Sequence, residues 1–245
     1  MKTGILAAFL LLLFLNLLFA ANTDSSAVPA ASTSAVMASA TSASSAVKPG
    51  HEFFGIVTGK ARKIAYVVDH SGSMTETIGY LRNEVKRSIR SLESDQSFFI
   101  TFFSSGPTID FPAKTAGLAP ANDQDKREAY EFINKIKAEG QTDPSDSLKK
   151  AFTLQPDVIY ILTDGEFDAK TADLIKQLNA KHKVRINTIC FIYSDGRKLL
   201  KSIAEDNNGK YRFVNEEDAK KLEKEPELPS ATPRSQKPPA PKAAS

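Results

Sequence analysis

Residues 63–74 read KIAYVVDHSGSM, and this stretch decides the fold class. Its first seven residues form an apolar, β-branched run without polar alternation, which predicts a short strand covered on both faces. Residues 75–94 follow with apolar side chains at helical spacing, namely Ile78, Leu81, Val85, Ile89 and Leu92. A buried strand that leads into an amphipathic helix is the first half of a β-α-β unit.

The rest of the chain repeats this alternation. Further strands are predicted at residues 98–103, 158–163, 185–193 and, as a last edge strand, 210–214. Helices are predicted at residues 126–138, 144–154, 169–180 and 198–206. Residues 108–111 form a short extended piece, and residues 51–57 are expected to add a short strand against an edge. The pattern predicts an α/β fold in a single domain, with a doubly wound, mainly parallel sheet flanked by helices on both faces.

The composition excludes several classes of protein. The 245 residues include 32 Lys+Arg and 29 Asp+Glu, a formal net charge of +3, with 41% hydrophobic and 25% charged residues. These values exclude a multi-span membrane protein, a collagen-like fibre and a fully disordered chain. The small positive balance gives no reason to expect nucleic acid as a partner. The single cysteine, Cys190, excludes an internal disulfide and a cysteine-based zinc site, and we expect it to be a buried, small apolar residue.

Both ends of the chain differ from its middle. Residues 1–21 join Lys2 to a long apolar run, which predicts export by a cleaved signal peptide or a retained N-terminal membrane anchor. Residues 22–50 are nearly all Ala, Ser, Thr and Val, and residues 223–245 are rich in proline, so both predict disordered segments. The folded domain is then 51–222, on the periplasmic or extracellular side, either membrane-anchored or secreted.

Oxygen-bearing side chains follow the predicted strands. Asp69, Ser71 and Ser73 alternate along the loop after the first strand, so their oxygens can converge while His70 points away. Asp164 follows the strand at 158–163, and Thr142 lies in the loop before the helix at 144–154, where Asp143 suits the N-cap and Pro144 the first position. Carboxyl ends of parallel strands meet at one edge of the sheet, where ligands bind.

Two carboxylates and three hydroxyls are hard donors, which favour Mg²⁺ or Mn²⁺. The alternative is helix capping, since Ser73 and Glu76 have the spacing of a capping box. Asp168 and Glu166 are better explained as caps or surface residues than as part of a metal's surroundings. Neither His51, which has no evident partner in the sequence, nor the exposed His182 suggests a site.

DHSGS at the end of an apolar strand, with GQTD and ILTDG later in the chain, resembles the von Willebrand factor type A domain family. The surrounding sequence also resembles that of exported bacterial members. The resemblance implies a doubly wound α/β fold with a metal-ion-dependent adhesion site. In this sequence it implies Asp69, Ser71, Ser73 and Thr142 as ligands, directly or through water, and Asp164 as a direct or water-mediated acidic ligand. His70 departs from many members at its position.

Three functions are compatible with such a site. The first is a non-enzymatic adhesion or scaffold module, in which a partner protein's Asp or Glu carboxylate completes the coordination of the cation, with no small-molecule substrate. The second is a Mg²⁺-dependent hydrolase of the aspartyl-phosphate type, although Ser71 stands where such phosphatases need a second aspartate. The third is a structural module whose metal site is vestigial. No residue is expected to be catalytic under the first reading.

Overall fold

The computed structural model describes residues 51–113, 117–165, 168–224 and 226. Its contacts divide the chain into two units after Ala46, and the described residues all belong to the second. The segments predicted at 1–21 and 22–50, and nearly all of 223–245, lie outside the described residues. Within those residues, no helix has both the length and the apolar character needed to cross a bilayer.

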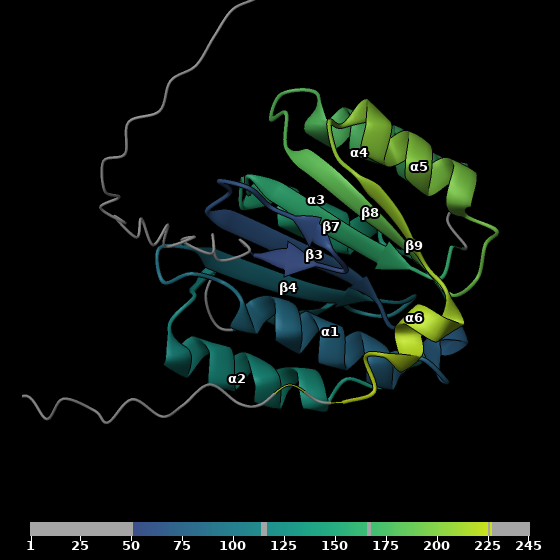
Figure 1. The fold of residues 1–245 in the computed structure, drawn as a ribbon. Coiled ribbons are helices and arrows are strands. Elements are labelled where there is room, and N and C mark those ends of the chain that lie inside the picture. Colours follow the sequence, from purple (N-terminus) through teal and green to yellow (C-terminus); the bar gives the residue numbers. More distant parts are fainter. Residues whose placement is uncertain (1–50, 114–116, 166–167, 225, 227–245) are drawn as a thin grey trace, which may run out of the picture. The chain divides into compact units, whose positions relative to one another are not determined.

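A seven-stranded sheet forms the centre of the domain (Figure 1). Its five parallel strands lie in the order β4-β3-β7-β8-β9, and two short strands, β5 and β6, pair antiparallel with the outer side of β4. The bounds are β3 Lys63–Asp69, β4 Ser97–Phe103, β5 Ile109–Phe111, β6 Ala119–Pro120, β7 Val158–Thr163, β8 Arg185–Phe191 and β9 Tyr211–Val214. The chain runs outward from β3 to β4 and then crosses back to β7. The ends of β3 and β7 therefore border the switch point of this α/β sheet, where ligands bind.

Helices cover both faces of the sheet, as predicted. On one face, α1 (Ile78–Arg90) and α2 (Asp123–Asn134) pack on Ile64, Tyr66 and Val68 of β3, and the short helix α6 (Glu216–Lys220) joins the same core. On the other face, α3 (Ser145–Thr153), α4 (Ala169–Asn179) and α5 (Arg197–Asp206) pack on alternate residues such as Ala65 and Val67. Because both faces are apolar, the strands read as continuous hydrophobic runs.

Several helix boundaries differ from those expected. The helix predicted from residue 75 starts at Ile78, because a 3-10 turn, η1 (Gly72–Met74), comes first. The helix predicted from residue 126 starts at Asp123, where the Asn122 side chain caps it by accepting the Asp125 N–H. Pro144 lies at the N-cap of α3 rather than inside the helix, and Asp143 Oδ1 accepts the Ser145 N–H at 3.0 Å.

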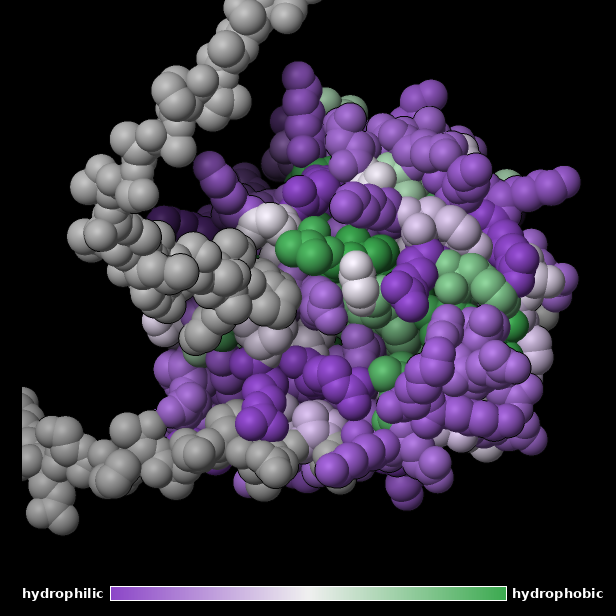
Figure 2. Space-filling model, viewed as in Figure 1, coloured by the Kyte–Doolittle hydropathy of each residue, from purple (hydrophilic) through white to green (hydrophobic). Residues whose placement is uncertain are grey.

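Residues 51–57 pack on one face of the sheet, not against its edge as expected. They form a separate two-stranded hairpin of β1 (Glu52–Phe53) and β2 (Ile56–Val57), whose Phe53 side chain is fully buried in the core shared with α1. Apolar residues reach the surface over this hairpin in Figure 2, and Val57 is 42% exposed. Local sequence does not reveal this position, because the hairpin's contacts lie far along the chain.

His51 begins the hairpin and has close partners, contrary to expectation. Its Nε2 lies 2.6 Å from the Tyr66 hydroxyl and 2.9 Å from Ser88 Oγ, and those two oxygens are 3.0 Å apart. The side chain is buried, and burial lowers the pKa of His51 to about 3, with a smaller contribution from Lys126. The partners are 15 and 37 residues away in sequence, which is why the sequence alone did not identify them.

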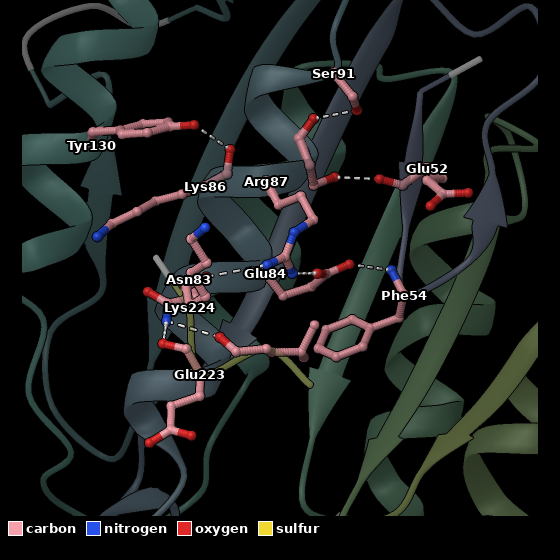
Figure 3. Close-up of polar contacts among 12 residues, drawn as sticks. Glu52, Phe54, Asn83, Glu84, Lys86, Arg87, Ser91, Tyr130, Glu223 and Lys224 are labelled. Atoms are coloured by element: carbon pink, nitrogen blue, oxygen red, sulfur yellow. Dashed lines mark hydrogen bonds and ion pairs between the residues drawn. The ribbon is translucent and has the colours of Figure 1, made fainter. Parts of the chain in front are cut away.

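Helix α1 holds both ends of the domain by polar contacts (Figure 3). Glu84 Oε1 accepts the Phe54 N–H of the hairpin at 2.8 Å, and its other oxygen pairs with Arg87 at 2.7 Å. At the C-terminal end, Asn83 Nδ2 donates to the carbonyls of Leu222 and Glu223, each at 2.9 Å. The start and the end of the domain therefore meet on consecutive residues of one helix.

Candidate metal centre

Asp69 ends β3 in a fully buried position at the switch point of the sheet. Its Oδ1 accepts the Ser71 N–H at 2.8 Å, and its Oδ2 accepts the Thr163 hydroxyl at 2.7 Å. Thr163 is the last residue of β7, so the loop after β3 and the end of the neighbouring strand each hold one oxygen of the carboxylate. Such hydrogen bonds orient a ligand before the metal binds.

The environment of Asp69 disfavours an isolated negative charge. Burial raises the pKa of this carboxyl to about 6, the hydrogen bonds from Ser71 and Thr163 act in the opposite direction, and Asp164 adds to the rise. Two acidic groups therefore lie near each other in a buried place. A bound cation would remove the unfavourable energy of both charges.

Asp164 follows β7 and lacks a partner in the part of the chain that the structure describes. The residue is 3% exposed, and both of its carboxylate oxygens are buried without a hydrogen bond. It lines a cavity of about 210 Å³ together with Ser73, Tyr193 and Asp195. Buried carboxylates are normally paired or bound to a metal, so these orphaned oxygens fit a cation in or beside this cavity.

The hydroxyls of Ser71 and Ser73 complete the first loop. Their Oγ atoms lie 3.0 Å apart, which brings two neutral donors together beside Asp69. Ser71 precedes η1 but forms no side-chain cap, and α1 starts five residues after Ser73 with Thr77 at its N-cap. The arrangement is therefore not the capping box that the spacing of Ser73 and Glu76 also allowed.

The loop that carries Thr142 is bound to the first loop through its backbone. The Gly72 N–H donates to the Gly140 carbonyl at 2.9 Å, and the Glu139 N–H donates to the His70 carbonyl at 2.8 Å. Gly140 has φ +76°, and a Cβ there would lie 3.0 Å from Ser105 Oγ, so both conformation and space favour glycine. The Thr142 side chain is half-buried and lines a different cavity from that of Asp164, together with Gln141 and Asp168.

His70 lies beside these donors in sequence but is directed elsewhere. Its Nδ1 lies 2.9 Å from the Lys137 carbonyl, and its ring meets Phe102 edge-on. Of the five predicted ligands, the structure thus groups Asp69, Ser71, Ser73 and Asp164, and it places Thr142 on the adjoining loop. Within the described residues, no group of three or more His, Cys, Asp or Glu side chains forms a metal cluster. The donor set of two carboxylates with hydroxyls fits Mg²⁺ or Mn²⁺ rather than zinc.

Three residues of this region were not selected from the sequence. Thr163 positions Asp69, while Tyr193 and Asp195 line the cavity beside Asp164. Tyr193 and Asp195 follow β8, a parallel strand next to β7, so the rule that pointed to Asp164 applies to them as well. Asp168 caps α4 by accepting the Lys170 N–H, in agreement with its predicted capping role, and Glu166 lies outside the described residues.

Comparison with known sequences now identifies the family. Residues 62–213, more than half of the chain, match the family model of the von Willebrand factor type A domain. The chain belongs to the von Willebrand factor type A domain family. Two human relatives of this family are the von Willebrand factor A domain-containing proteins 3B and 3A, 27% identical over 155 residues and 26% identical over 186 residues. The matches cover 62% and 68% of this chain but only 12% and 15% of the human proteins.

Solved structures share the type A fold. A von Willebrand factor type A protein from Catenulispora acidiphila superposes with a TM-score of 0.57 at 21% identity, over 69% of this chain and 41% of that one. The open conformation of the pilus adhesin SpaC from Lactobacillus rhamnosus GG gives 0.53 at 14% identity, over 69% and 29%. Proximal thread matrix protein 1 of the mussel byssus gives 0.52 at 21% identity, over 66% and 43%. At these identities the likeness establishes the fold.

Proposed function

We propose that this type A domain is a non-enzymatic protein-binding module, whose Mg²⁺- or Mn²⁺-loaded site captures a partner's Asp or Glu carboxylate. The observation that supports it most is the pair of buried, unpartnered oxygens of Asp164, beside Ser73 and near Asp69. Only two carboxylates belong to the proposed ligand set. A bound divalent cation would have coordination positions that these residues leave free for a partner's carboxylate.

Each residue of the proposed metal site has a defined role. Asp69 and Asp164 offset the charge of the cation, and the Ser71 N–H and Thr163 hydroxyl hold Asp69 in place. Ser71 and Ser73 offer neutral oxygens, so they bind the cation without cancelling its charge. Thr142 contributes from the adjoining loop, directly or through water.

The solved relatives support a binding role without determining it. Two of them are named as a pilus adhesin and a thread matrix protein, which are proteins of adhesion and of structural material. A hydrolase of the aspartyl-phosphate type remains the second candidate only because Asp69 lies at a strand end. Ser71 occupies the position of the second acid that such phosphatases use, and its short side chain has no carboxyl group.

A pull-down from the exported fraction of the source cells tests the proposal. Immobilised residues 47–245 should retain a partner in Mg²⁺ and release it when a chelator is added. The variant Asp69→Ala should retain none, whereas Asp146→Asn, which changes an exposed carboxylate on α3, should behave as wild type. Retention that is indifferent to the chelator and to Asp69→Ala would contradict the proposal. Turnover of a phosphate ester by wild type and not by Asp69→Asn would favour the hydrolase instead.

We also propose that the domain acts outside the cytoplasm. The support is the apolar run within residues 1–21, followed by the Ala/Ser/Thr-rich residues 22–50. Fractionation of cells that express the full chain should find it in the membrane or exported fractions. Recovery in the cytoplasmic fraction alone would contradict this part of the proposal.

A further inference from the structure

The cavity at the candidate metal centre has two lining residues that the proposed metal ligation does not use. Ser73 and Asp164 belong to the ligand set, while Tyr193 and Asp195 come from the loop between β8 and α5. We call Tyr193 and Asp195 the rim pair. Its members lie next to the place where a partner's carboxylate would bind. Their chemistry therefore selects which side chains the partner can have beside that carboxylate.

Close backbone packing fixes Asp195 near Asp164. Gly165 follows Asp164, Gly196 follows Asp195, and these two glycines pack directly against each other. A Cβ on Gly165 would lie 2.7 Å from the Gly196 nitrogen, and a Cβ on Gly196 would overlap the Gly165 carbonyl oxygen. Gly165 also has φ +114°, which L side chains rarely adopt. The sequence therefore uses glycine in both loops to bring the two carboxylates to one cavity.

Tyr193 is exposed, yet its backbone is held on both sides. Its N–H donates to the Phe191 carbonyl at 2.8 Å, and its carbonyl accepts the Cys190 thiol at 3.0 Å. Ile192, which lies between Phe191 and Tyr193, has φ +63°, a strained conformation for a β-branched residue. The Ile192 N–H donates to the Val214 carbonyl at 2.8 Å, which ties this turn to β9. The loop thus presents Tyr193, a residue that is 48% exposed, from a fixed position.

The charges around the cavity are unbalanced. Asp69, Asp164 and Asp195 contribute three carboxylates, and none of the four residues that line the cavity is basic. One divalent cation offsets two of these charges and leaves one. The nearby Arg197 is stacked on the Phe213 ring, 3.5 Å from its centroid. None of the ion pairs within the described part of the chain involves Asp195.

We infer that the rim pair is a second subsite, which receives a Lys or Arg side chain of the partner next to its metal-bound carboxylate. The cation would pair with Asp195 and lie over the Tyr193 ring, and arginine suits both contacts because its planar group stacks and forms hydrogen bonds. The preferred partner segment therefore carries an acidic residue with a basic neighbour. This inference rests on the proposed function and adds a sequence preference to it.

Blocked peptides with one acidic residue test the inference on ¹⁵N-labelled residues 47–245. In saturating Mg²⁺, the amide shifts of Tyr193 and Asp195 give the affinity for Gly-Arg-Asp-Gly, and for the same peptide with uncharged citrulline in place of Arg. Wild type should bind the Arg peptide about tenfold more tightly, because an exposed ion pair and a cation–π contact act together. The preference should shrink as salt is added.

Variants separate the two members of the rim pair from the rest of the surface. Asp195→Asn and Tyr193→Ala should each reduce the preference for the Arg peptide to about threefold. Asp173→Asn changes an exposed carboxylate on α4 outside the cavity and should keep the wild-type preference. Equal affinity for the two peptides in wild type would overturn the rim-pair inference alone. If neither peptide binds, or binding survives a chelator, the proposed function fails and this inference fails with it.

Discussion

Thr163 shows, at the scale of single residues, how a side chain outside the predicted ligand set supports the site. Its hydroxyl donates to Asp69 Oδ2 at 2.7 Å and also accepts the Gly165 N–H at 3.2 Å, so it connects the ends of β3 and β7 with the loop of Asp164. Thr163 therefore holds one proposed metal ligand, Asp69, directly, and it holds the loop of the other, Asp164, through Gly165. Its loss should therefore be detected first in metal affinity.

Thr163→Val keeps the shape of the side chain and removes the hydroxyl. We expect the dissociation constant for Mn²⁺ to rise about tenfold, the lower end of what outer hydrogen bonds to metal ligands contribute. Thr188→Val in β8 is the matched control, because the Thr188 hydroxyl is also buried but donates to the Leu200 carbonyl. Calorimetric titration of both variants checks this. An equal loss of affinity in the two would show that general destabilisation is responsible.

Asp164 should also affect the stability of the domain when no metal is bound. Replacing Asp164 by Asn removes a buried negative charge close to Asp69. In the presence of a chelator, Asp164→Asn should raise the free energy of unfolding by about 1 kcal/mol, while added Mn²⁺ should no longer stabilise the variant. Urea unfolding with and without Mn²⁺ measures both effects. A variant that is less stable without metal, yet still stabilised by it, would be inconsistent with a metal-ligating Asp164.

At the scale of elements, the β1–β2 hairpin depends on a neutral histidine. His51 contacts Tyr66 of β3 and Ser88 of α1, so it joins the hairpin to both layers beneath it. The pKa of His51 falls to about 3 in the folded state, mainly through burial, against 6.5 as its ordinary value. Between these values the unfolded chain binds a proton that the folded chain does not.

The stability of the domain should therefore fall as the pH drops below 6.5, by up to about 1.4 kcal/mol per pH unit from His51. Asp69 acts in the opposite direction, since its raised pKa makes the folded state bind the extra proton between 3.8 and about 6. The difference between wild type and His51→Gln isolates the histidine. Urea unfolding of both proteins across this range should give a difference that changes with pH. A constant difference would mean that folding does not lower the pKa of His51.

The elements also show which parts of the fold the sequence could predict. β3 and β7 were predicted to the residue, because a strand buried on both faces is marked by a local apolar run. The start of α1 was predicted three residues early, because residues 75–77 form a turn between η1 and α1 and are all polar, so apolar spacing does not mark the boundary. The hairpin was placed at an edge, since its position depends on Tyr66, Glu84 and Ser88, which are distant in sequence.

For the whole molecule, topology explains why the candidate site was only partly predictable. Parallel strands bring the residues after β3, β7 and β8 to one edge of the sheet, so a predicted parallel sheet was enough to select Asp69 and Asp164 at the ends of two strands. Asp195 follows the same rule, but nothing in its local sequence distinguishes it from other exposed acids. Its significance comes from the packing of Gly165 on Gly196, a contact between loops that only the folded structure reveals.

The most direct test of the proposed metal centre is calorimetric titration of residues 47–245 with Mn²⁺, beside the double variant Asp69→Ala, Asp164→Ala. We predict one saturable site in the wild type and none in the double variant, with Mg²⁺ competing for the same site. If the wild type takes up no Mn²⁺ at millimolar metal, or if the double variant binds it equally well, the metal centre is not where we place it.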